Sequence, residues 1–263
     1  MLVSSVYFKT IGQTKMLPSY TTYAPIYDEL GLARFAQDYT PSTIQFLQQE
    51  DWMGRKILDA GCGTGAATHW LARNGYIVTA LDQSKDMIAH AHNLYHSFHN
   101  IEWHTTNILK PLEGINRVDL AIGWGLINEL NGAGELQATF QNVYQVLEQE
   151  RPFVFDVLTL QGVLDGQHQT TQLMVDSPNL TVFSTHTLDF ERQAQITQYY
   201  IYYRQEKVWL RTNTEQIRRA YPIQALETLL KRVGFRSVQY LNLALEPIST
   251  FHNQSHVIVI AGK

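Results

Sequence analysis

The sequence is poor in cysteine, in long apolar runs and in positive charge, and each shortage narrows its class. Cys62 is the single cysteine, so no disulfide framework can form within the chain. No apolar run reaches the length of a membrane span, and Met1–Leu17 lacks the ordered basic, apolar and cleavage regions of a signal peptide. The net charge of -4 offers no basic face for nucleic acid. We therefore expect a cytoplasmic protein that binds neither nucleic acid nor membrane.

Short apolar runs alternate with helical patterns along most of the 263 residues, which are enough to bury one sizeable core. This rhythm predicts an α/β fold with a doubly wound, mostly parallel seven-stranded sheet covered on both faces. The expected parallel strands are one ending near Leu58, then Tyr76–Asp82, Ile101–Asn107, Val118–Gly125 and Pro152–Thr159. Phe235–Leu243 and His256–Ala261 are expected to form a hairpin that closes one edge of the sheet antiparallel.

Apolar spacing and capping residues locate the helices. Pro41 suits the first turn of a helix that precedes the first strand, and Ser84 suits the N-cap of a later one. The remaining expected helices are Ala66–Arg73, Glu135–Leu147 and Ile223–Val233. Three histidines of the helix after Ser84 share its polar side, with no cysteine or carboxylate at ligand spacing; they are His92, His96 and His99. A solvated face is favoured there, and no metal site is expected.

Residues 161–211 depart from the α/β rhythm. Their β-rich runs are Gln172–Asp176, Leu180–Leu188, Ile196–Arg204 and Lys207–Arg211, with turn residues between them. We expect three or four antiparallel strands inserted after strand five as a lid. The chain then divides into a loosely ordered extension (1–19), an α/β domain (20–160 and 212–263) and the insertion (161–211).

The stretch Lys56–Gly65 carries the most specific chemistry of the chain. Asp59 follows a short apolar strand, and Gly61, Gly63 and Gly65 follow it at alternate positions. A strand that stops in such a turn and opens into a helix lets backbone amides approach a ligand closely. Asp82 ends the next strand, where a carboxylate can accept both hydroxyls of a ribose. These features predict a nucleoside-containing cofactor at the tips of the first two strands.

The spacing of the glycines distinguishes between cofactors. The dinucleotide fingerprint is G-x-G-x-x-G, with a pyrophosphate at the helix N-terminus. Here the spacing is G-x-G-x-G, and the nearby carboxylate of Asp59 would repel a pyrophosphate but attract an ammonium group. A nucleoside joined to an amino acid, S-adenosylmethionine, meets both conditions. An NAD(P)-dependent oxidoreductase is the weaker enzymatic alternative.

These motifs resemble those of class I S-adenosylmethionine-dependent methyltransferases, and Leu58–Gly65 matches closely. The outer motifs are similar to those of small-molecule enzymes with an inserted β-lid, such as the dTDP-amino-sugar N-methyltransferases. They are Tyr23-Ala-Pro-Ile-Tyr-Asp28, Asp38-Tyr39, Phe155-Asp156-Val157, Glu215…Arg219-Ala-Tyr221 and Gly234-Phe235. The resemblance implies a Rossmann-like fold and S-adenosylmethionine as the cofactor.

By that resemblance, fourteen residues are expected at the cofactor. They are Tyr27, Tyr39, Asp59, Ala60, Gly61, Gly63, Gly65, Asp82, Gln83, Met87, Asn107, Ile108, Gly123 and Trp124. Asp59 and Gly61 would meet the methionine part, Asp82 the ribose and Asn107-Ile108 the adenine. Asn107 replaces the usual aspartate, and Ile217 stands where many relatives have a histidine.

Candidates for the acceptor side surround the expected mouth of the site. Asn128 and His186 are the catalytic candidates, although Asn128 could cap a helix and His186 could be an exposed strand residue. The candidates for acceptor binding are Tyr23, Glu129, Asp156, Tyr203, Arg211 and Arg219. Because the donor is already activated, orienting the acceptor and excluding water matter more than any one acid–base group.

The sequence therefore predicts methyl transfer to an O or N atom of a small molecule by in-line displacement. The N-P-P-Y type of motif used on amide and exocyclic amine nitrogens is missing, which favours a small metabolite over protein or nucleic acid. A non-catalytic S-adenosylmethionine-binding protein stays open as an alternative. The acceptor's identity is left open, and the protein is expected to be a monomer or homodimer.

Overall fold

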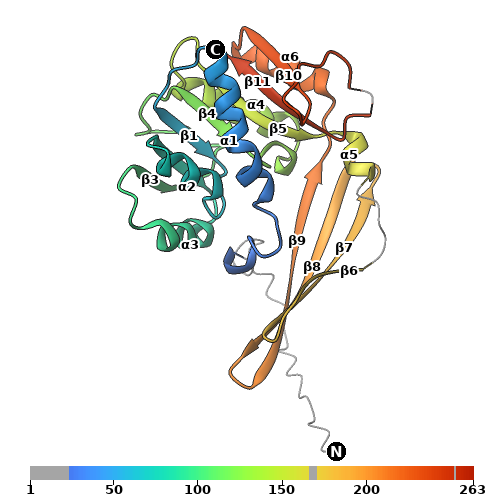
Figure 1. Cartoon of the computed structure of the whole chain (residues 1–263). Helices are drawn as coiled ribbons and strands as arrows, with labels where there is room; N and C mark the ends of the chain where they lie inside the picture. Colours follow the sequence, from blue (N-terminus) through green and yellow to red (C-terminus); the bar gives the residue numbers. More distant parts are fainter. Residues whose placement is uncertain (1–23, 166–170, 252) are drawn as a thin grey trace, which may run out of the picture.

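The computed structural model describes residues 24–165, 171–251 and 253–263. The expected N-terminal extension and the acceptor candidate Tyr23 therefore lie outside the described residues. Two β-sheets dominate the structure, a broad one covered by helices and a narrow one that projects from it as a long twisted ribbon (Figure 1). None of the helices within the described ranges is long and apolar enough to cross a membrane.

The broad sheet has seven strands in an order that reverses direction beside the first strand. Its parallel strands are β1 (Lys56–Ala60), β2 (Ile77–Asp82), β3 (Ile101–Thr105), β4 (Leu120–Gly123) and β5 (Pro152–Leu158). The edge hairpin consists of β10 (Ser237–Leu241) and β11 (His256–Gly262), and β11 pairs antiparallel with β5. The strand order is β10-β11-β5-β4-β1-β2-β3. This arrangement confirms the predicted doubly wound, mostly parallel sheet.

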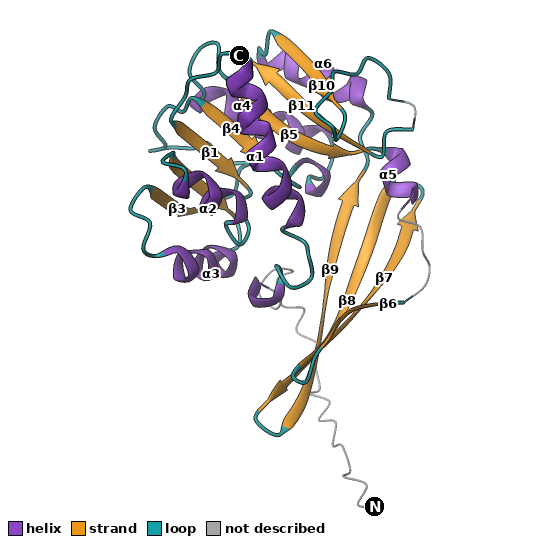
Figure 2. Ribbon diagram, in the orientation of Figure 1, coloured by secondary structure: helices purple, strands orange, loops and turns teal. Residues whose placement is uncertain are grey.

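Helices cover both faces of this sheet (Figure 2). The α-helices of the domain are α1 (Arg34–Gln49), α2 (Ala66–Arg73), α3 (Lys85–Tyr95), α4 (Ala133–Val146) and α6 (Ile223–Val233). Ile44, Leu47 and Leu71 of α1 and α2 belong to one apolar cluster, whereas Phe140 and Leu230 of α4 and α6 belong to another. The strands are buried between these clusters, as expected of parallel strands with near-continuous apolar sequence. Their carboxyl ends therefore meet at one edge.

One helix prediction was wrong at its start. Pro41 was expected in a first turn, but α1 begins at Arg34 and has the proline in its interior. Proline lacks the N–H that would bond to the carbonyl of Gln37. The residues of α1 that precede Pro41 still fold as helix, because the rings of Phe35 and Tyr39 pack against the apolar core. Tertiary packing thus outweighs the local cost of the proline.

The narrow sheet, called the second sheet from here on, is antiparallel with the order β6-β7-β8-β9. Its strands are β6 (Gln172–Asp176), β7 (Leu180–Asp189), β8 (Ala194–Gln205) and β9 (Val208–Arg219). The sequence predicted that the last of these strands ends at Arg211, which was wrong, since β9 extends to Arg219. Because β8 pairs with β9 along its whole length, from Gln205↔Val208 to Ala194↔Arg219, β9 continues to the broad sheet.

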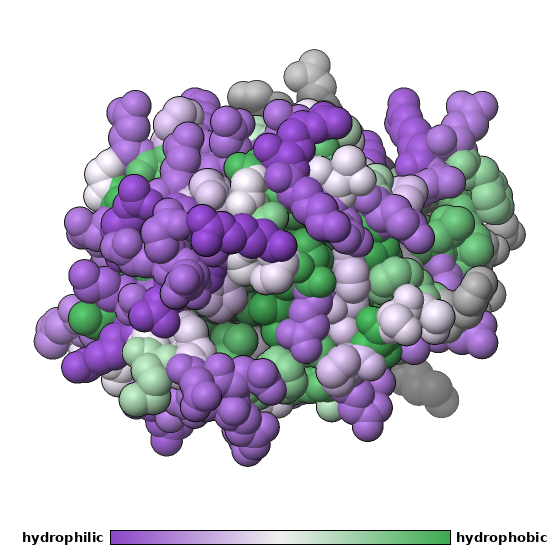
Figure 3. All heavy atoms as spheres, turned by 90° about the horizontal axis from the view of Figure 1, so that it is seen from above, coloured by the Kyte–Doolittle hydropathy of each residue, from purple (hydrophilic) through white to green (hydrophobic). Residues whose placement is uncertain are grey.

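Three short helices have no counterpart in the sequence prediction. They are α5 (Leu160–Asp165), which follows β5, and the 3₁₀ turns η1 (Ala24–Ile26) and η2 (Ile127–Glu129). A small apolar cluster joins η1, α3 and the second sheet, and its members include Ala24, Met87, Val182 and Ile201. The second sheet is thus packed on the domain near the carboxyl ends of the parallel strands. Seen from above, hydrophobic residues show between hydrophilic ones in the middle of this face of the molecule (Figure 3).

Candidate functional site

A cavity of about 340 Å³ lies at the carboxyl ends of the parallel strands. The glycine turn after β1 forms one wall, and the ends of β4 and β5 form another. Tyr27, which follows η1, and Arg218 of β9 also line it. The cavity therefore lies where ligands bind in open α/β sheets, at the reversal of strand order.

The glycine turn is held by β2 and leaves space for a ligand. The backbone N–H groups of Gly61 and Cys62 both donate to the carbonyl oxygen of Leu81, at 2.8 and 2.9 Å. Gly63 has a φ of 55°, and a Cβ placed on it would meet no atom within 4 Å. Gly65 has a φ of 82°, and its Cβ would lie 2.8 Å from the ring of Trp103. Gly63 thus opens toward the cavity, whereas Gly65 allows close packing beneath it.

Two buried carboxylates flank this turn. Asp59 is 2% exposed and accepts a 2.5 Å hydrogen bond from the hydroxyl of Thr68. Asp82 accepts from the backbone N–H of Gly63 at 3.0 Å and from that of Ser84 at 2.8 Å. Burial, only partly offset by these bonds, raises the pKa of each carboxyl to about 6. A bound cation or hydroxyl donors would stabilise the ionised form of both carboxyls.

The segment after β3 forms the opposite side of the cavity. The side-chain oxygen of Asn107 accepts from the backbone N–H of Leu109 at 2.9 Å. The side-chain amide of Asn142 donates to the carbonyl oxygen of Ile108 at 2.7 Å. A carboxamide oxygen has two lone pairs, so Asn107 keeps one acceptor position for a ligand amino group. The chain is fixed on both sides of Ile108, which is buried against the core.

The mouth of the cavity is rich in aromatic rings. Phe35 of α1 stacks on Tyr39 with ring centroids 4.3 Å apart and meets Trp124 edge-on at 5.6 Å. The indole N–H of Trp124 donates to the hydroxyl of Thr40 at 3.0 Å. Phe35 and Trp124 line the cavity, and Tyr39 lies behind Phe35. These contacts fix α1 against the loop that follows β4.

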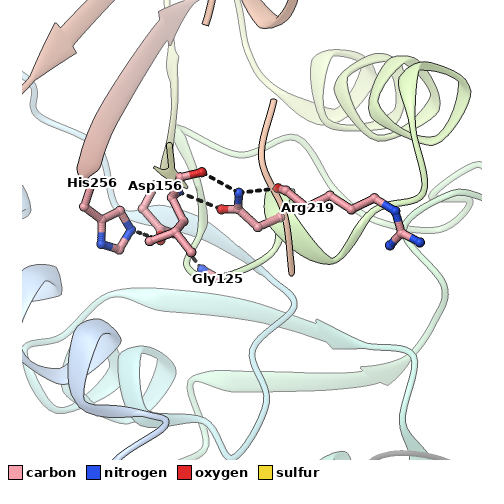
Figure 4. A network of polar contacts seen from close by, with 6 residues as sticks. Gly125, Asp156, Arg219 and His256 are labelled. Carbon is pink, nitrogen blue, oxygen red and sulfur yellow. Dashed lines mark hydrogen bonds and ion pairs between the residues drawn. The ribbon is translucent and has the colours of Figure 1, made fainter. Parts of the chain in front are cut away.

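A second polar group lies where β5 meets β11. The imidazole Nε2 of His256 is 2.6 Å from one carboxylate oxygen of Asp156 (Figure 4). The other oxygen accepts a 2.6 Å hydrogen bond from the backbone N–H of Gly125. Both side chains line the cavity. Asp156 therefore connects the ends of β4, β5 and β11 at the ligand-facing edge.

The side chain of Asn128 bonds the main chain of two strands, β5 and β9, at the rim of the cavity. Its amide nitrogen donates to the carbonyl oxygens of Leu158 and Arg219, at 2.8 and 2.6 Å. Its oxygen accepts from the N–H of Leu158 at 2.8 Å. Figure 4 shows that the guanidinium of Arg219 points away from this bonded backbone. With both amide protons used, Asn128 holds β9 against β5.

The structure brings thirteen of the expected site residues to the cavity wall. On the cofactor side they are Tyr27, Asp59, Gly61, Gly63, Asp82, Gln83, Met87, Asn107, Ile108 and Trp124. On the acceptor side they are Asn128, Glu129 and Asp156. Ala60, Gly65 and Gly123 are sequence neighbours of lining residues but do not line the cavity themselves. Tyr39 does not line it either, and its ring stacks on that of Phe35, which does.

Four acceptor-side candidates of the second sheet lie away from the cavity. His186 contacts the hydroxyl of Thr197 through Nδ1 at 2.9 Å. Arg211 lies over the rings of Tyr200 and Tyr202, 5.7 and 5.8 Å from their centroids. Tyr203 is an exposed strand residue, and only the backbone of Arg219 reaches the rim. The structure gives none of these side chains a contact with the cavity.

Sequence reasoning missed several lining residues, of which Phe35, Arg218 and His256 carry chemistry. His256 was seen only as the first residue of an edge strand, and its partner lies 100 positions earlier. The sequence prediction named Arg219 instead of Arg218. It ended the strand at Arg211, so the alternation of side chains along β9 was not followed as far as these two residues. Among the described residues, no group of three or more His, Cys, Asp or Glu side chains is placed to hold a metal ion.

Comparisons with known proteins agree with this geometry. Residues 57–150 match a methyltransferase domain family. A putative methyltransferase from Geobacillus sp. (strain WCH70) is 34% identical over 143 residues, which cover 53% of this chain and 57% of the relative. The chain thus spans little more than half the length of that curated relative.

Two solved structures share the fold over almost the whole chain. An S-adenosylmethionine-dependent methyltransferase from Clostridium acetobutylicum has a TM-score of 0.77 at 18% identity, covering 93% of this chain and 99% of its own. The sugar N-methyltransferase KedS8 from Streptoalloteichus has a TM-score of 0.73 at 16% identity, covering 99% and 97%. At these identities the likeness establishes the fold.

Proposed function

We propose that this protein methylates a small molecule. Residues 57–150 match a methyltransferase domain family, and the chain shares its fold with an S-adenosylmethionine-dependent methyltransferase. The methyl group would pass from S-adenosylmethionine to an O or N atom of the acceptor. The cofactor supplies a methyl group already activated by a sulfonium charge. The protein's residues then have to bind, orient and exclude water.

One observation carries this proposal: a single cavity joins the glycine turn to the Asp156 region. At the first end, Gly63 leaves an open cradle, and Asp59 and Asp82 present buried carboxylates on either side of it. A ligand with an ammonium group and a ribose satisfies both carboxylates, whereas a pyrophosphate would be repelled by Asp59. Asn107 and Ile108 offer the second lone pair and the apolar surface that suit an adenine. The residues present therefore fit S-adenosylmethionine.

The other end of the cavity suits a polar acceptor. Asp156 and Glu129 place carboxylates there, and Arg218 of β9 adds a cation. Glu129 accepts a 2.6 Å hydrogen bond from the side-chain amide of Gln216, which fixes its position. KedS8, which shares the fold, acts on a sugar nitrogen according to its name, and an amino sugar matches this mixture of acceptors and donors. We propose a small polar acceptor of this kind.

Methyl transfer of this type depends on alignment more than on any single acid or base. Well-oriented reactant pairs gain roughly 7–11 kcal/mol from positioning. The rings of Phe35, Trp124 and Tyr27 all line the cavity and can exclude water from it. β9, held to the rim by Asn128, keeps Arg218 at the wall.

Isothermal titration calorimetry with S-adenosylhomocysteine tests the proposal. Asp82→Ala removes the carboxylate expected to accept two ribose hydroxyls, so affinity falls roughly 10- to 100-fold. Glu113→Ala, which removes an equal charge from an exposed position, is the matched control and leaves affinity unchanged.

Two results would contradict the assignment. One is equal affinity of the wild-type protein and Asp82→Ala for S-adenosylhomocysteine. The other is fluorescence enhancement of NADH on mixing with the protein, which would indicate a nicotinamide cofactor instead. Turnover is then sought with tritiated S-adenosylmethionine and a panel of amino sugars, amines and hydroxylated metabolites.

A further inference from the structure

His256 and Asp156 lie 100 residues apart in the chain and meet at the cavity wall. β5 and β11 pair antiparallel with His256 opposite Leu158, so two neighbouring strands present the two side chains on one face. Nε2 and the carboxylate oxygen are 2.6 Å apart, and the side chains are only 19% and 5% exposed. The pair is thus a short, sheltered contact in the acceptor half of the cavity.

Two contacts fix the orientation of this pair. The N–H of Gly125 bonds the second oxygen of Asp156 at 2.6 Å and keeps the carboxylate from rotating (Figure 4). Phe35 stacks on the imidazole with ring centroids 4.4 Å apart and planes at 26°. Because a carboxylate only accepts, the Nε2 of His256 carries the proton of this bond, and in the neutral form of the ring Nδ1 keeps a lone pair.

Within residues 24–165, 171–251 and 253–263, no donor bonds Nδ1 of His256. The arrangement matches the general logic of an oriented base: a carboxylate sets the tautomer, and the opposite nitrogen receives a proton. The ring is held between Phe35 and Asp156, is only 19% exposed and lines the cavity.

We propose that His256 accepts the proton that the acceptor loses on methylation, with Asp156 as its positioning residue. This inference rests on the proposed function. As the C–O or C–N bond forms, the S–CH₃ bond breaks and leaves neutral S-adenosylhomocysteine. The acceptor's O–H or N–H proton passes to Nδ1, giving an imidazolium stabilised by the Asp156 carboxylate, and then leaves to solvent. Charge and atoms balance without a further reactant.

Asn128 and Tyr27, two other polar residues at the cavity, are less suited to this role. Both amide protons of Asn128 bond main-chain carbonyls, and an amide does not take up a proton at neutral pH. Burial, followed by the nearby charge of Glu129, raises the pKa of Tyr27 well above its usual range, so its hydroxyl stays protonated. His186, the other histidine considered, does not line the cavity.

A pair of cofactor analogues tests the proposal without knowledge of the acceptor. Sinefungin carries a C–NH₃⁺ group where S-adenosylmethionine has S–CH₃, whereas S-adenosylhomocysteine has neither. A proton acceptor on the acceptor side of the departing methyl group should bond the ammonium of sinefungin through a water that takes the place of the acceptor atom, and should not contact S-adenosylhomocysteine. Calorimetry on the full chain therefore compares the two affinities in each variant.

Two variants remove the acceptor position by different routes. His256→Phe keeps the ring and its stacking on Phe35 but has no nitrogen. Asp156→Asn offers the imidazole a donor, so the proton moves to Nδ1 and the lone pair is lost. Each variant should weaken sinefungin by roughly tenfold or more, the range of one charge-assisted hydrogen bond, and change S-adenosylhomocysteine affinity less than about twofold. His92→Phe, on the exposed side of α3, should change neither affinity.

Each remaining outcome counts against the proposal. If both variants bind sinefungin as the wild type does, the pair does not face the methyl group. If both ligands weaken together in both variants, the pair serves the cofactor or the fold, and the role is structural. If the wild-type protein binds neither ligand, the proposed function itself fails, which the first two outcomes would not imply.

Discussion

The side-chain amide of Gln216 donates a 2.6 Å hydrogen bond to the carboxylate of Glu129. Gln216 belongs to β9 of the second sheet, and Glu129 belongs to η2, directly after β4. The bond therefore joins the inserted sheet to the rim of the cavity. Together with the bond from Asn128 to the backbone of Arg219, it fixes the end of β9 beside the candidate acceptor region.

Gln216→Leu should loosen this junction. The substitution keeps the side-chain size but removes the amide donor, which costs about 1–2 kcal/mol of unfolding free energy. Amides of β9 and η2 should exchange faster in hydrogen–deuterium exchange measured by mass spectrometry. Gln198→Leu is the control, because Gln198 makes an equally short bond to Glu215 in an exposed position. Equal exchange in both variants would contradict the role given to Gln216.

Asn128→Ala should be costly because Asn128 is 2% exposed and bonds three main-chain groups. The substitution leaves the N–H and C=O of Leu158 and the C=O of Arg219 without these partners. We expect a loss of roughly 2–5 kcal/mol in denaturant unfolding, with the cofactor-side carboxylates untouched. A stable Asn128→Ala protein that has lost only turnover would instead support direct contact with the acceptor.

Alanine substitutions at two glycines of the turn should have different effects, one on ligand affinity and the other on stability. Gly63→Ala places its Cβ in open space toward the cavity, so it should mainly weaken S-adenosylhomocysteine, with a strain of about 1 kcal/mol from its positive φ. Gly65→Ala pushes its Cβ to 2.8 Å from Trp103, so it should mainly lower stability, by about 2–4 kcal/mol. Calorimetry and thermal unfolding of both variants distinguish the two effects. A reversed pattern would show that Gly65, not Gly63, faces the ligand.

Cofactor affinity should fall on acidification through pH 6. Burial raises the pKa values of Asp59 and Asp82 to about 6, and ligand ammonium and ribose groups favour the ionised forms. Between pH 7.5 and pH 5 the free protein takes up protons at these sites, so S-adenosylhomocysteine should bind at least roughly tenfold more weakly at pH 5. Asp59→Asn should flatten part of this dependence. Affinity independent of pH would contradict the assignment.

The stability of the ligand-free protein should rise on acidification through pH 6, whereas cofactor affinity falls. A carboxyl with a raised folded-state pKa contributes stability below its unfolded pKa and loses it as the pH rises through about 6. These two carboxyls therefore disfavour the folded state at pH 7.5. Asp59→Asn keeps an oxygen for Thr68 and removes the buried charge, so it should stabilise the ligand-free protein by up to about 3 kcal/mol. Thermal unfolding without ligand at pH 7.5 measures this gain.

The local sequence determined the fold class and one half of the candidate site. Alternation of apolar runs with helical spacing is a short-range property, and it located α2 and α6 at their observed residues. Asp59, Gly61 and Gly63 come together at the cavity because consecutive residues form a tight turn, which requires no distant contact. Asp82 joins them because neighbouring parallel strands must end at the same edge.

Tertiary structure decided how the acceptor half is assembled, although the sequence predicted three of its residues, Asn128, Glu129 and Asp156. His256 meets Asp156 only because β11 pairs with β5 in one particular register, and no local pattern specifies that register. Asn128 bonds the backbones of Leu158 and Arg219, so its role depends on where β9 ends. A short stretch of chain sets its own turns and periodicity, but which distant side chains meet depends on strand pairing and packing of the whole core.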